Sequence, residues 1–329
     1  TRLYAYLCFF AAKGYPMLRF ISNIVLLLST LIVLLYHGPS FLNYRWGLAM
    51  LLELFPYLSS IALIGFIFVL VVPSLRQQKV RVAIASFLLI VCWAPILSWV
   101  GRPSLGAVPE GMRVMTYNLW IDNPKIDAIE QSIRHEDPDI LFLSEIRQET
   151  MDALRGRLDY PHSYRTTGSN KALFSRYPIL DATTDALGVE ERGRTFNLVA
   201  TLQLEDETVT VIGFHPPVPI IWEFFHIRNQ QLDSLIKASQ EIEGKLIILG
   251  DFNTTPWSPY FERFERKSEL QNAGRGQWLW ATWYFNQTLT TRYIKIPIDH
   301  IMTRGFQSVK TWTGMTGGSD HKPVITILQ

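Results

Sequence analysis

Eight polar residues stand within or at the ends of short β-rich segments beyond residue 112. They are carboxylates, amides and imidazoles, which bind hard cations and move protons: Asn118, Glu145, His215, Asp251, Asn253, Asp299, Asp320 and His321. A single carboxylate at a strand end is usually a helix cap or a turn residue. Strand ends on one side of a layered sheet converge, however, and eight such residues exceed what capping requires. We therefore expect these side chains to share one site.

The donor types in this set indicate which metal would fit it. Oxygen ligands without a cysteine or histidine cluster favour Mg²⁺ or Mn²⁺ over Zn²⁺. Both cysteines, Cys8 and Cys92, lie in the apolar N-terminal part of the chain, away from these residues. Imidazolium groups can donate hydrogen bonds to an anion near neutral pH. The set therefore predicts a Mg²⁺ or Mn²⁺ site that handles an anionic substrate.

The segments that carry these residues alternate with amphipathic stretches. We expect helices over 125–135, 148–158 and 227–243. The expected strands are RVMTYNLW, DILFLSEI, KALFSRYPI, FNLVATLQL, TVTVIGFH, KLIILGDFN, IDHIMTR and PVITIL. Many strands with a few helices outside them predict a sheet-on-sheet core flanked by helices.

Six motifs follow one another along this region: MTYNLW, LSEI, GFHPP, GDFNTTP, IDHI and SDHKPV. Together they resemble the endonuclease/exonuclease/phosphatase (DNase I-like) superfamily, which includes nucleases, neutral sphingomyelinases and inositol-polyphosphate phosphatases. The resemblance covers residues 113–328 and depends most on GDFN together with SDH. It implies an α/β four-layer sandwich, with two mixed β-sheets flanked by helices. It also implies an enzyme that hydrolyses phosphoric ester bonds with a divalent metal.

The resemblance assigns the metal-side residues one by one. Glu145 matches the family's metal-binding carboxylate, and Asn118 matches the amide beside it. Asp320 would either complete the metal environment or orient His321. A helix cap or a surface ion pair is the alternative for Glu145.

The remaining catalytic roles also follow from the resemblance. Asp251 would position the attacking water, as a base or through a hydrogen bond. Asn253, on the same face of an extended segment, would donate to a phosphoryl oxygen. His215 and His321 would donate hydrogen bonds to the phosphoryl group. Asp299 would pair with His321 and fix its tautomer.

The run PPVPIIWEFF, residues 216–225, follows His215 directly. Three prolines in a mostly apolar run of ten residues are incompatible with a regular core element. The run therefore predicts an interfacial anchor or a wall for an apolar substrate tail. Trp222 and Phe225 are the candidate contacts.

Two further positions are candidates for substrate contact. Arg176 in FSRYP matches a common family feature, although packing or an ion pair would explain it equally well. Trp280 belongs to a second aromatic cluster, QWLWATWYF, in which we expect Trp283 to be a core residue. His300, next to the IDHI aspartate, points to the opposite strand face and is expected to be structural.

The first hundred residues contain one acidic residue and three long apolar runs, about 17–36, 46–72 and 80–100. Each approaches the roughly 20 residues that cross a bilayer core. A signal peptide would be a single run with a cleavage site, and helices of a soluble core are seldom so long and uncharged. We therefore expect a membrane anchor over 1–100, a linker over 101–111 and a catalytic domain over 112–329.

The basic residues predict the orientation of these spans. Three lie before or at the start of the first run, and three lie between the second and third runs or at the start of the third: Arg2, Lys13, Arg19, Arg76, Lys79 and Arg81. The loop between the first and second runs has only one basic residue, Arg45. By the positive-inside rule the N-terminus is cytoplasmic. Three spans then place the catalytic domain on the outer side, periplasmic or extracellular, of a bacterial inner or plasma membrane.

The charge balance helps to choose among substrates. Beyond residue 100 there are 24 basic and 28 acidic residues, a formal net charge of −4. Proteins that grip nucleic acid non-specifically are usually basic. The charge therefore weighs against a general nuclease. The membrane anchor and the apolar run beside His215 favour a lipid-linked or phospholipid head-group phosphate as substrate, with membrane lipid as a possible partner. An extracytoplasmic nuclease or nucleotide phosphodiesterase is the alternative, and a non-catalytic membrane scaffold is an alternative of a different class. No protein partner is inferable.

Overall fold

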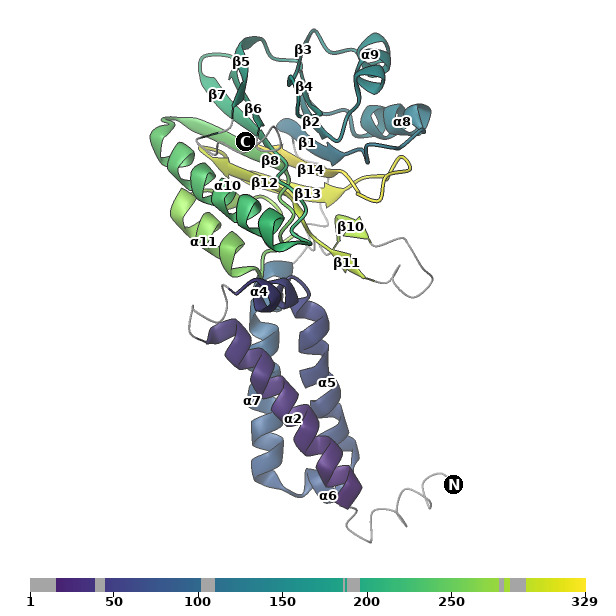
Figure 1. The fold of residues 1–329 in the computed structure, drawn as a ribbon, viewed down its shortest axis with the longest axis vertical. Coiled ribbons are helices and arrows are strands. Elements are labelled where there is room, and N and C mark those ends of the chain that lie inside the picture. The colour runs from purple at the N-terminus through teal and green to yellow at the C-terminus, as the bar shows by residue number, and fades with distance from the viewer. Residues whose placement is uncertain are drawn as a thin grey trace. The chain divides into compact units, whose positions relative to one another are not determined.

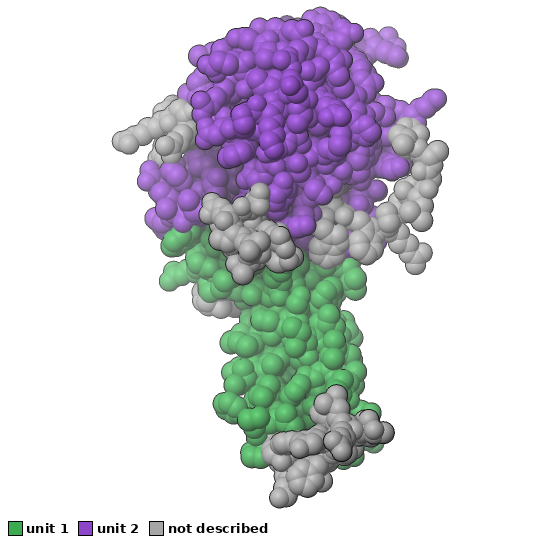
Figure 2. Space-filling model, turned by 90° about the vertical axis from the view of Figure 1, so that its right-hand side faces the viewer, with its two compact units in different colours: residues 1–98 green, residues 99–329 purple. Residues whose placement is uncertain are grey.

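The computed structural model describes residues 16–38, 45–101, 110–185, 187, 196–277, 281–284 and 294–329. The chain divides into two compact units, Thr1–Ser98 and Trp99–Gln329, which Figure 2 colours separately. The first unit is helical, and the second contains every strand in the described part of the chain.

The helices of the first unit have the bounds α2 Pro16–His37, α4 Trp46–Leu52, α5 Phe55–Val71, α6 Pro73–Arg76 and α7 Lys79–Val100, the last two residues of α7 belonging to the second unit. By length and composition, α2 and α7 could each cross a membrane. The predicted span over 46–72 is broken, because α4 and α5 are bent by 68° and make one candidate span only when taken together. Pro56 lies in the first turn of α5, where it has no N–H to continue the hydrogen bonding of α4. Two of the three predicted spans therefore form single helices, and the third is not confirmed.

Two six-stranded sheets form the centre of the second unit (Figure 1). The first has the order β13 Ser308–Thr313, β14 Val324–Leu328, β1 Met112–Asn118, β2 Ile140–Ser144, β4 Lys171–Ser175 and β3 His162–Arg165. The second has the order β5 Ile179–Asp185, β6 Asn197–Gln203, β7 Thr208–Phe214, β8 Lys245–Asp251, β12 Asp299–Arg304 and β9 Gln271–Asn272. β10 Trp283–Tyr284 and β11 Lys295–Ile296 make a small separate sheet. Each large sheet is mixed, with β1–β2 and β7–β8 as its parallel pair.

Helices cover the outer face of each sheet. α8 Ile126–Glu136 and α9 Gln148–Arg157 pack on the first sheet, and α10 Trp222–Glu241 and α11 Pro259–Ser268 pack on the second. Between the sheets lies a core to which both contribute, including Phe142 and Leu173 from the first and Val211 and Leu249 from the second. The predicted sandwich of two mixed sheets flanked by helices is confirmed.

The eight predicted strands are present, with bounds shifted by a few residues. The strands that the sequence did not reveal as separate elements include β3, β5, β9 and β13, which are the four edge strands of the two sheets. β5, for example, alternates between half-buried and exposed residues and has no fully buried one. α10 begins at Trp222, five residues before the predicted start, so WEFF belongs to a helix.

The strand order brings the predicted site residues to one edge of the sandwich. The parallel strands β1 and β2 end at Asn118 and Ser144, and the parallel strands β7 and β8 end at Phe214 and Asp251. β12 begins at Asp299, directly opposite Asp251 in the antiparallel register. Both sheets therefore deliver their polar strand ends to the same place.

Gly250 permits this close arrangement. Its φ of 145° disfavours other residues, and a Cβ there would lie 1.8 Å from the carbonyl oxygen of Phe214. Any side chain at this position would push β8 away from β7 just before Asp251. The glycine of GDFN is thus a steric requirement of the strand pair that positions the aspartate.

Candidate active site

Asn118 joins the carboxylates of the two sheets. Its Nδ2 donates to Glu145 Oε1 at 3.0 Å and to Asp251 Oδ2 at 3.1 Å. The backbone N–H of Trp120 donates to Asn118 Oδ1 at 3.0 Å, which fixes which end of the amide faces the carboxylates. Asn118 therefore holds Glu145 and Asp251 at a set separation across the interface between the sheets.

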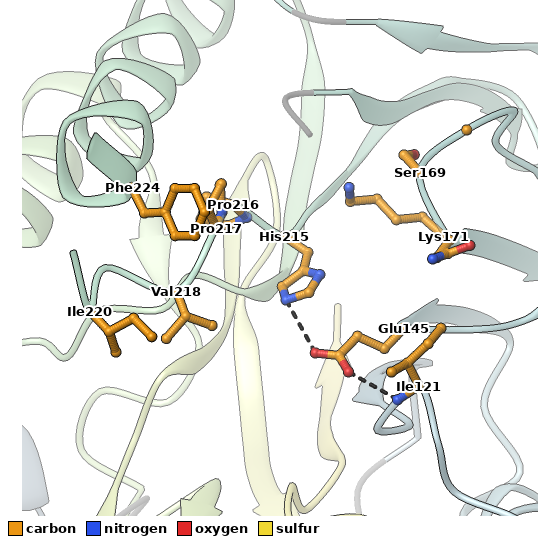
Figure 3. Close-up of a pocket in the computed structure, with 12 residues that line it drawn as sticks. Ile121, Glu145, Ser169, Lys171, His215, Pro216, Pro217, Val218, Ile220 and Phe224 are labelled. Atoms are coloured by element: carbon orange, nitrogen blue, oxygen red, sulfur yellow. Dashed lines mark hydrogen bonds and ion pairs between the residues drawn. The ribbon is translucent and has the colours of Figure 1, made fainter. Parts of the chain in front are cut away.

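Glu145 lies in a left-handed backbone conformation immediately after β2, with φ 55°. The N–H of Ile121 donates to its Oε2 at 2.9 Å, and His215 Nε2 lies 3.6 Å from its Oε1 (Figure 3). The same His215 nitrogen lies 3.6 Å from Asp251 Oδ2. Such a backbone conformation is costly for a non-glycine residue and occurs preferentially at functional sites. Glu145, Asp251 and His215 thus point to one location.

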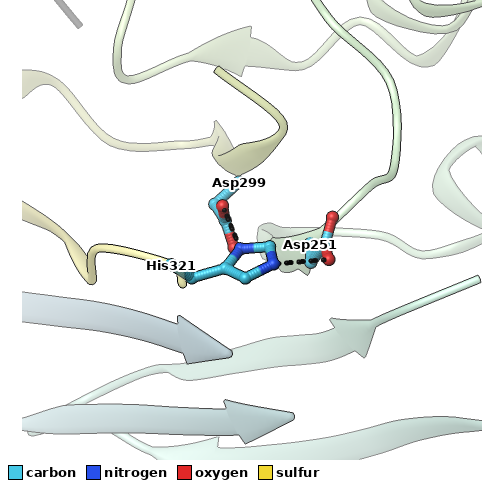
Figure 4. Close-up of side chains that lie close together, drawn as sticks. All are labelled: Asp251, Asp299 and His321. Carbon is cyan, nitrogen blue, oxygen red and sulfur yellow. Dashed lines mark hydrogen bonds and ion pairs between the residues drawn. The ribbon is translucent and has the colours of Figure 1, made fainter. Parts of the chain in front are cut away.

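A second group links Asp251 with the C-terminal histidine (Figure 4). His321 Nδ1 lies 2.9 Å from Asp299 Oδ2, and His321 Nε2 lies 3.6 Å from Asp251 Oδ2. The backbone N–H of Asp299 donates to Thr282 Oγ1 at 3.0 Å, which fixes the start of β12. Asp299 therefore orients the His321 ring so that its other nitrogen faces Asp251.

Burial and charge separate the protonation behaviour of these groups. Burial raises the pKa of Asp251 to about 8. Burial lowers the pKa of His215 to about 4. Burial alone would also lower the pKa of His321, but Asp299 and Asp251 raise it to about 10. At neutral pH the site therefore has one neutral and one cationic imidazole, which suits them to different tasks.

Asn253 differs from the prediction in its backbone. It has φ 51° and is not extended, so it does not share a strand face with Asp251. Its N–H donates to Asp251 Oδ1 at 2.8 Å, and its Nδ2 donates to the carbonyl oxygen of Pro216 at 3.0 Å. The buried Arg228 donates to the Asn253 carbonyl oxygen at 2.7 Å. Asn253, in the tight turn after β8, thus connects Asp251 to the loop that follows His215 through hydrogen bonds to both.

The SDH motif uses its serine as well as its histidine. Ser319 Oγ donates to the Asn118 carbonyl oxygen at 2.8 Å and accepts from the His321 N–H at 2.9 Å. Asp320 Oδ2 instead accepts a hydrogen bond from Trp283 Nε1 at 2.9 Å. Asp320 was predicted either to complete the metal environment or to orient His321. The residue that contacts the His321 ring is Asp299, so the second of these roles does not belong to Asp320.

Two predicted substrate contacts are not supported by their positions. Arg176 follows the end of β4 remote from the site and pairs with Asp137 and with Asp139, the latter at 2.9 Å. Phe225 is fully buried in α10, because this helix begins earlier than predicted and turns that residue into the core. Trp222 is 55% exposed. Trp280 lies outside the described residues.

Lys171 is a site residue that the sequence did not suggest. It is the first residue of β4, paired in register with Ser144 at the site end of β2. Its side chain lines the pocket beside Glu145 and His215 (Figure 3), and burial lowers its pKa to about 8. A lysine that begins a strand ordinarily marks the solvated end of that strand, so its type and position gave no signal.

The donor set fits a hard divalent cation. Three carboxylates, Glu145, Asp251 and Asp299, converge with the amide of Asn118, whereas cysteine is absent from the site. Asp299 Oδ1 is buried and accepts no hydrogen bond within the described part of the chain. Asp251, Asp299 and His321 can also offer ligand atoms within 4.8 Å of one another. Oxygen donors of this kind suit Mg²⁺ or Mn²⁺.

A family comparison agrees with this arrangement. The endonuclease/exonuclease/phosphatase family matches residues 115–321, which include every polar residue of the site from Asn118 to His321. The chain belongs to this family. Endonucleases, exonucleases and phosphatases all hydrolyse phosphoesters, so membership supports a metal-dependent phosphoester hydrolase.

Sequence relatives share a smaller part of the chain. Two UPF0294 proteins of Vibrio vulnificus, from strains YJ016 and CMCP6, are each 36% identical over 99 residues. The match covers 30% of this chain and 32% of each relative, so the chain spans about a third of their length.

Solved structures share the fold of the second unit. Sphingomyelinase C from Streptomyces griseocarneus is similar with a TM-score of 0.53 at 15% identity, over 67% of this chain and 100% of that one. D. rerio TDP2 complexed with single-strand DNA product gives 0.57 at 14% identity, over 67% and 100%. A beta toxin mutant from Staphylococcus aureus with bound magnesium ions gives 0.52 at 15% identity, over 67% and 100%. At these identities the likeness establishes the fold.

Proposed function

We propose that the protein hydrolyses lipid-linked or phospholipid head-group phosphoesters with Mg²⁺ or Mn²⁺. The observation that carries this proposal is a pocket of about 580 Å³ that adjoins Glu145 and His215. Its wall on the side of α10 is formed by apolar side chains (Figure 3): Pro216, Pro217, Val218, Ile220 and Phe224. An apolar wall beside a cluster of catalytic polar groups suits a substrate whose phosphate is attached to a hydrocarbon chain.

The surface beside this pocket is also apolar. Val218 is 48% exposed, Ile220 is 69% exposed and Trp222 is 55% exposed. Apolar side chains that cluster at the mouth of a site, rather than scattered singly, mark a surface that meets an apolar partner. Membrane lipid is the partner that fits both this surface and the candidate spans of the first unit.

Each side chain of the site has a task in phosphoester hydrolysis. Glu145 would hold the metal, which supplies charge neutralisation at the phosphoryl group. Asn118, predicted as a metal-side amide, presents Nδ2 to the carboxylates and would instead keep Glu145 and Asp251 in place. Asp251 in its ionised form would accept a hydrogen bond from the attacking water, and its raised pKa makes it a stronger base than an ordinary carboxylate. His321, kept cationic by Asp299, would donate to a phosphoryl oxygen.

His215 and Asn253 complete the proposed set. His215 is neutral at neutral pH, so it would donate one hydrogen bond to the phosphoryl group without adding charge. Asn253 uses one amide hydrogen on Pro216, and its second would be available for a phosphoryl oxygen. Asp320 would lie at the edge of the site, where its carboxylate is held by Trp283.

The first hundred residues would anchor the enzyme, with residues 101–111 as a linker to a catalytic domain over 112–329. The basic residues near the candidate spans, such as Arg19, Arg76 and Arg81, favour a cytoplasmic N-terminus and an outward-facing catalytic domain. A bacterial inner or plasma membrane would be the location.

A hydrolysis panel tests the substrate class. The detergent-purified protein with Mg²⁺ is compared on lipid phosphoesters, nucleotides and DNA, with kcat/KM measured for each. We expect the lipid phosphoesters to react fastest. Faster hydrolysis of DNA or nucleotides would establish the extracytoplasmic nuclease or nucleotide phosphodiesterase instead. If no substrate is hydrolysed, the non-catalytic membrane scaffold becomes the favoured alternative.

A further inference from the structure

The pocket beside the site has a second wall of different chemistry, formed by residues 168–171. Lys171 is only 3% exposed, yet its side chain extends from β4 toward His215 (Figure 3). Its Nζ donates to the carbonyl oxygen of Phe196 at 2.7 Å. One carbonyl uses one of the three ammonium hydrogens, so the group retains the capacity to bind a second acceptor.

The charge of Lys171 is not matched by a carboxylate in the described part of the chain. Among the described residues, no Asp or Glu forms an ion pair with its Nζ, whereas the half-buried Lys245 pairs with Glu207. An ammonium group buried without a counter-charge is costly, and proteins keep such groups mainly where an anion will pair with them. The unmatched charge next to a pocket therefore indicates an anionic ligand.

The two walls together define what the pocket accepts. The wall of residues 216–224 is apolar, and the opposite wall presents the Lys171 ammonium. The attacked phosphoryl group belongs at Glu145 and His321, so Lys171 is placed to meet a different charged group of the same substrate. We propose that Lys171 binds a second anionic group, so that the substrate is an apolar-tailed phosphoester with a diphosphate or comparably anionic head. This inference rests on the proposed function and narrows it.

The positive charge of Lys171 disfavours a substrate with a zwitterionic head group. A choline or ethanolamine phosphoester would place a cation in the pocket that Lys171 lines, without a carboxylate on that wall to receive it. Like charges in a partly desolvated pocket repel, and such repulsion is an effective source of specificity. Lys171 thus favours anionic head groups and disfavours zwitterionic ones.

Substrate comparison in Lys171 variants tests this specificity. We would measure kcat/KM of the full chain on geranylgeranyl diphosphate and on lysophosphatidylcholine, for wild type, Lys171→Met and Lys171→Arg. In each substrate water attacks the phosphorus next to the apolar tail and the P–O bond to the tail breaks, which releases the tail alcohol with diphosphate or with phosphocholine. Methionine is close to lysine in shape and removes the buried charge, so the fold should persist, as checked by circular dichroism. Lys245→Met, at the opposite end of β8, is the matched control and should leave both rates unchanged.

We expect Lys171→Met to lower kcat/KM on the diphosphate by about 10- to 100-fold, the scale of a charged hydrogen bond. The rate on the choline ester should stay the same or rise, and Lys171→Arg should retain part of the preference for the diphosphate. An equal loss on both substrates, or no loss on either, would overturn the proposal.

A binding measurement separates this inference from the proposed function. Methylenediphosphonate, which cannot be hydrolysed, and phosphocholine are titrated calorimetrically into the Mg²⁺-equilibrated full chain. We expect the diphosphonate to bind more tightly, and its Kd to rise about 10-fold or more in Lys171→Met but not in Lys245→Met. If the protein hydrolyses no lipid yet shows this pattern, the proposed function fails and the Lys171 site stands. Equal binding of the diphosphonate by wild type and Lys171→Met, or no binding at all, would refute the Lys171 site.

Discussion

At the scale of single residues, the charge state of His321 depends on its pairing with Asp299. Asp299 Oδ2 holds Nδ1 at 2.9 Å and, with Asp251, raises the pKa of a ring whose burial would otherwise lower it. An imidazole that is cationic at neutral pH can stabilise negative charge on a phosphoryl group without a proton transfer. We therefore propose that the pair acts as one unit in which both members are needed.

Replacement of either member tests this unit. We expect His321→Ala and Asp299→Asn each to lower kcat by on the order of 10²-fold or more, since a charged donor or its orientation is lost. His135→Ala, an exposed histidine on α8, serves as the control and should retain full activity. Near wild-type turnover in a folded His321→Ala protein would show that the site is misassigned.

The types of the site residues were predictable, but their surroundings were not. The family motifs indicated Glu145, Asp251 and His321, and the structure brings these side chains together. Lys171 and Ser319 contribute through positions that depend on strand register, and a lysine or serine alone carries no such signal. The role of Asp320 was ambiguous because the motif does not reveal that its carboxylate accepts a hydrogen bond from Trp283.

At the scale of elements, the start of α10 decides which side chains of the 216–225 run can meet a substrate. Phe225 is fully buried, with its ring against Tyr260 of α11, whereas Trp222 is more than half exposed. Trp222 is the first residue of α10 and its ring stacks on the outer side of Phe225, with 6.3 Å between the ring centroids. Phe225 therefore has a core role and Trp222 a surface role.

Paired substitutions distinguish these roles. We expect Phe225→Ala to lower the free energy of unfolding by about 3–5 kcal/mol, because it leaves a cavity in the core. Trp222→Ala should change that free energy by only about 0.5 kcal/mol and lower kcat/KM on a lipid substrate about 10-fold. Chemical denaturation and assays on a lipid and a short soluble phosphoester provide the measurements. An equal loss on both substrates would mean that Trp222 supports the catalytic fold rather than the lipid.

The contact between β7 and β8 makes a second prediction at this scale. Gly250→Ala would place a Cβ against the Phe214 carbonyl oxygen and force φ out of its native range. We expect a loss of stability of more than about 1 kcal/mol and a lower kcat, because Asp251 moves with the strand. Gly156→Ala in α9, where nothing lies within 4 Å of the added Cβ, should be neutral or stabilising. A Gly250→Ala protein as stable and active as wild type would contradict this account of the strand pair.

Elements with buried faces were predictable from the sequence, and edge elements were not. β2, β7 and β8 are continuous or nearly continuous apolar runs because both of their faces are covered. β3 and β13 contain mostly half-buried residues, and their patterns resemble loops. The early start of α10 was hidden because its first turn consists of large apolar residues that also suit a lipid-facing loop.

At the scale of the whole molecule, the basic residues around the candidate spans predict that the catalytic domain is outside. Protease added to intact spheroplasts should therefore digest the region after residue 101 and leave the N-terminal helices protected. Immunoblotting with epitope tags at each end reads out the two regions. Digestion of the catalytic domain only after lysis would reverse the orientation.

The central claim is that the oxygen-rich site of the second unit hydrolyses phosphoesters with a divalent metal. The most direct measurement is hydrolysis of a soluble chromogenic phosphodiester by the detergent-purified protein before and after EDTA treatment, together with Glu145→Gln. We predict that EDTA abolishes hydrolysis, that added Mg²⁺ or Mn²⁺ restores it, and that Glu145→Gln weakens metal affinity by about 10- to 100-fold or more while the protein stays folded. Full activity after exhaustive EDTA treatment, or unchanged metal dependence in Glu145→Gln, would contradict the claim.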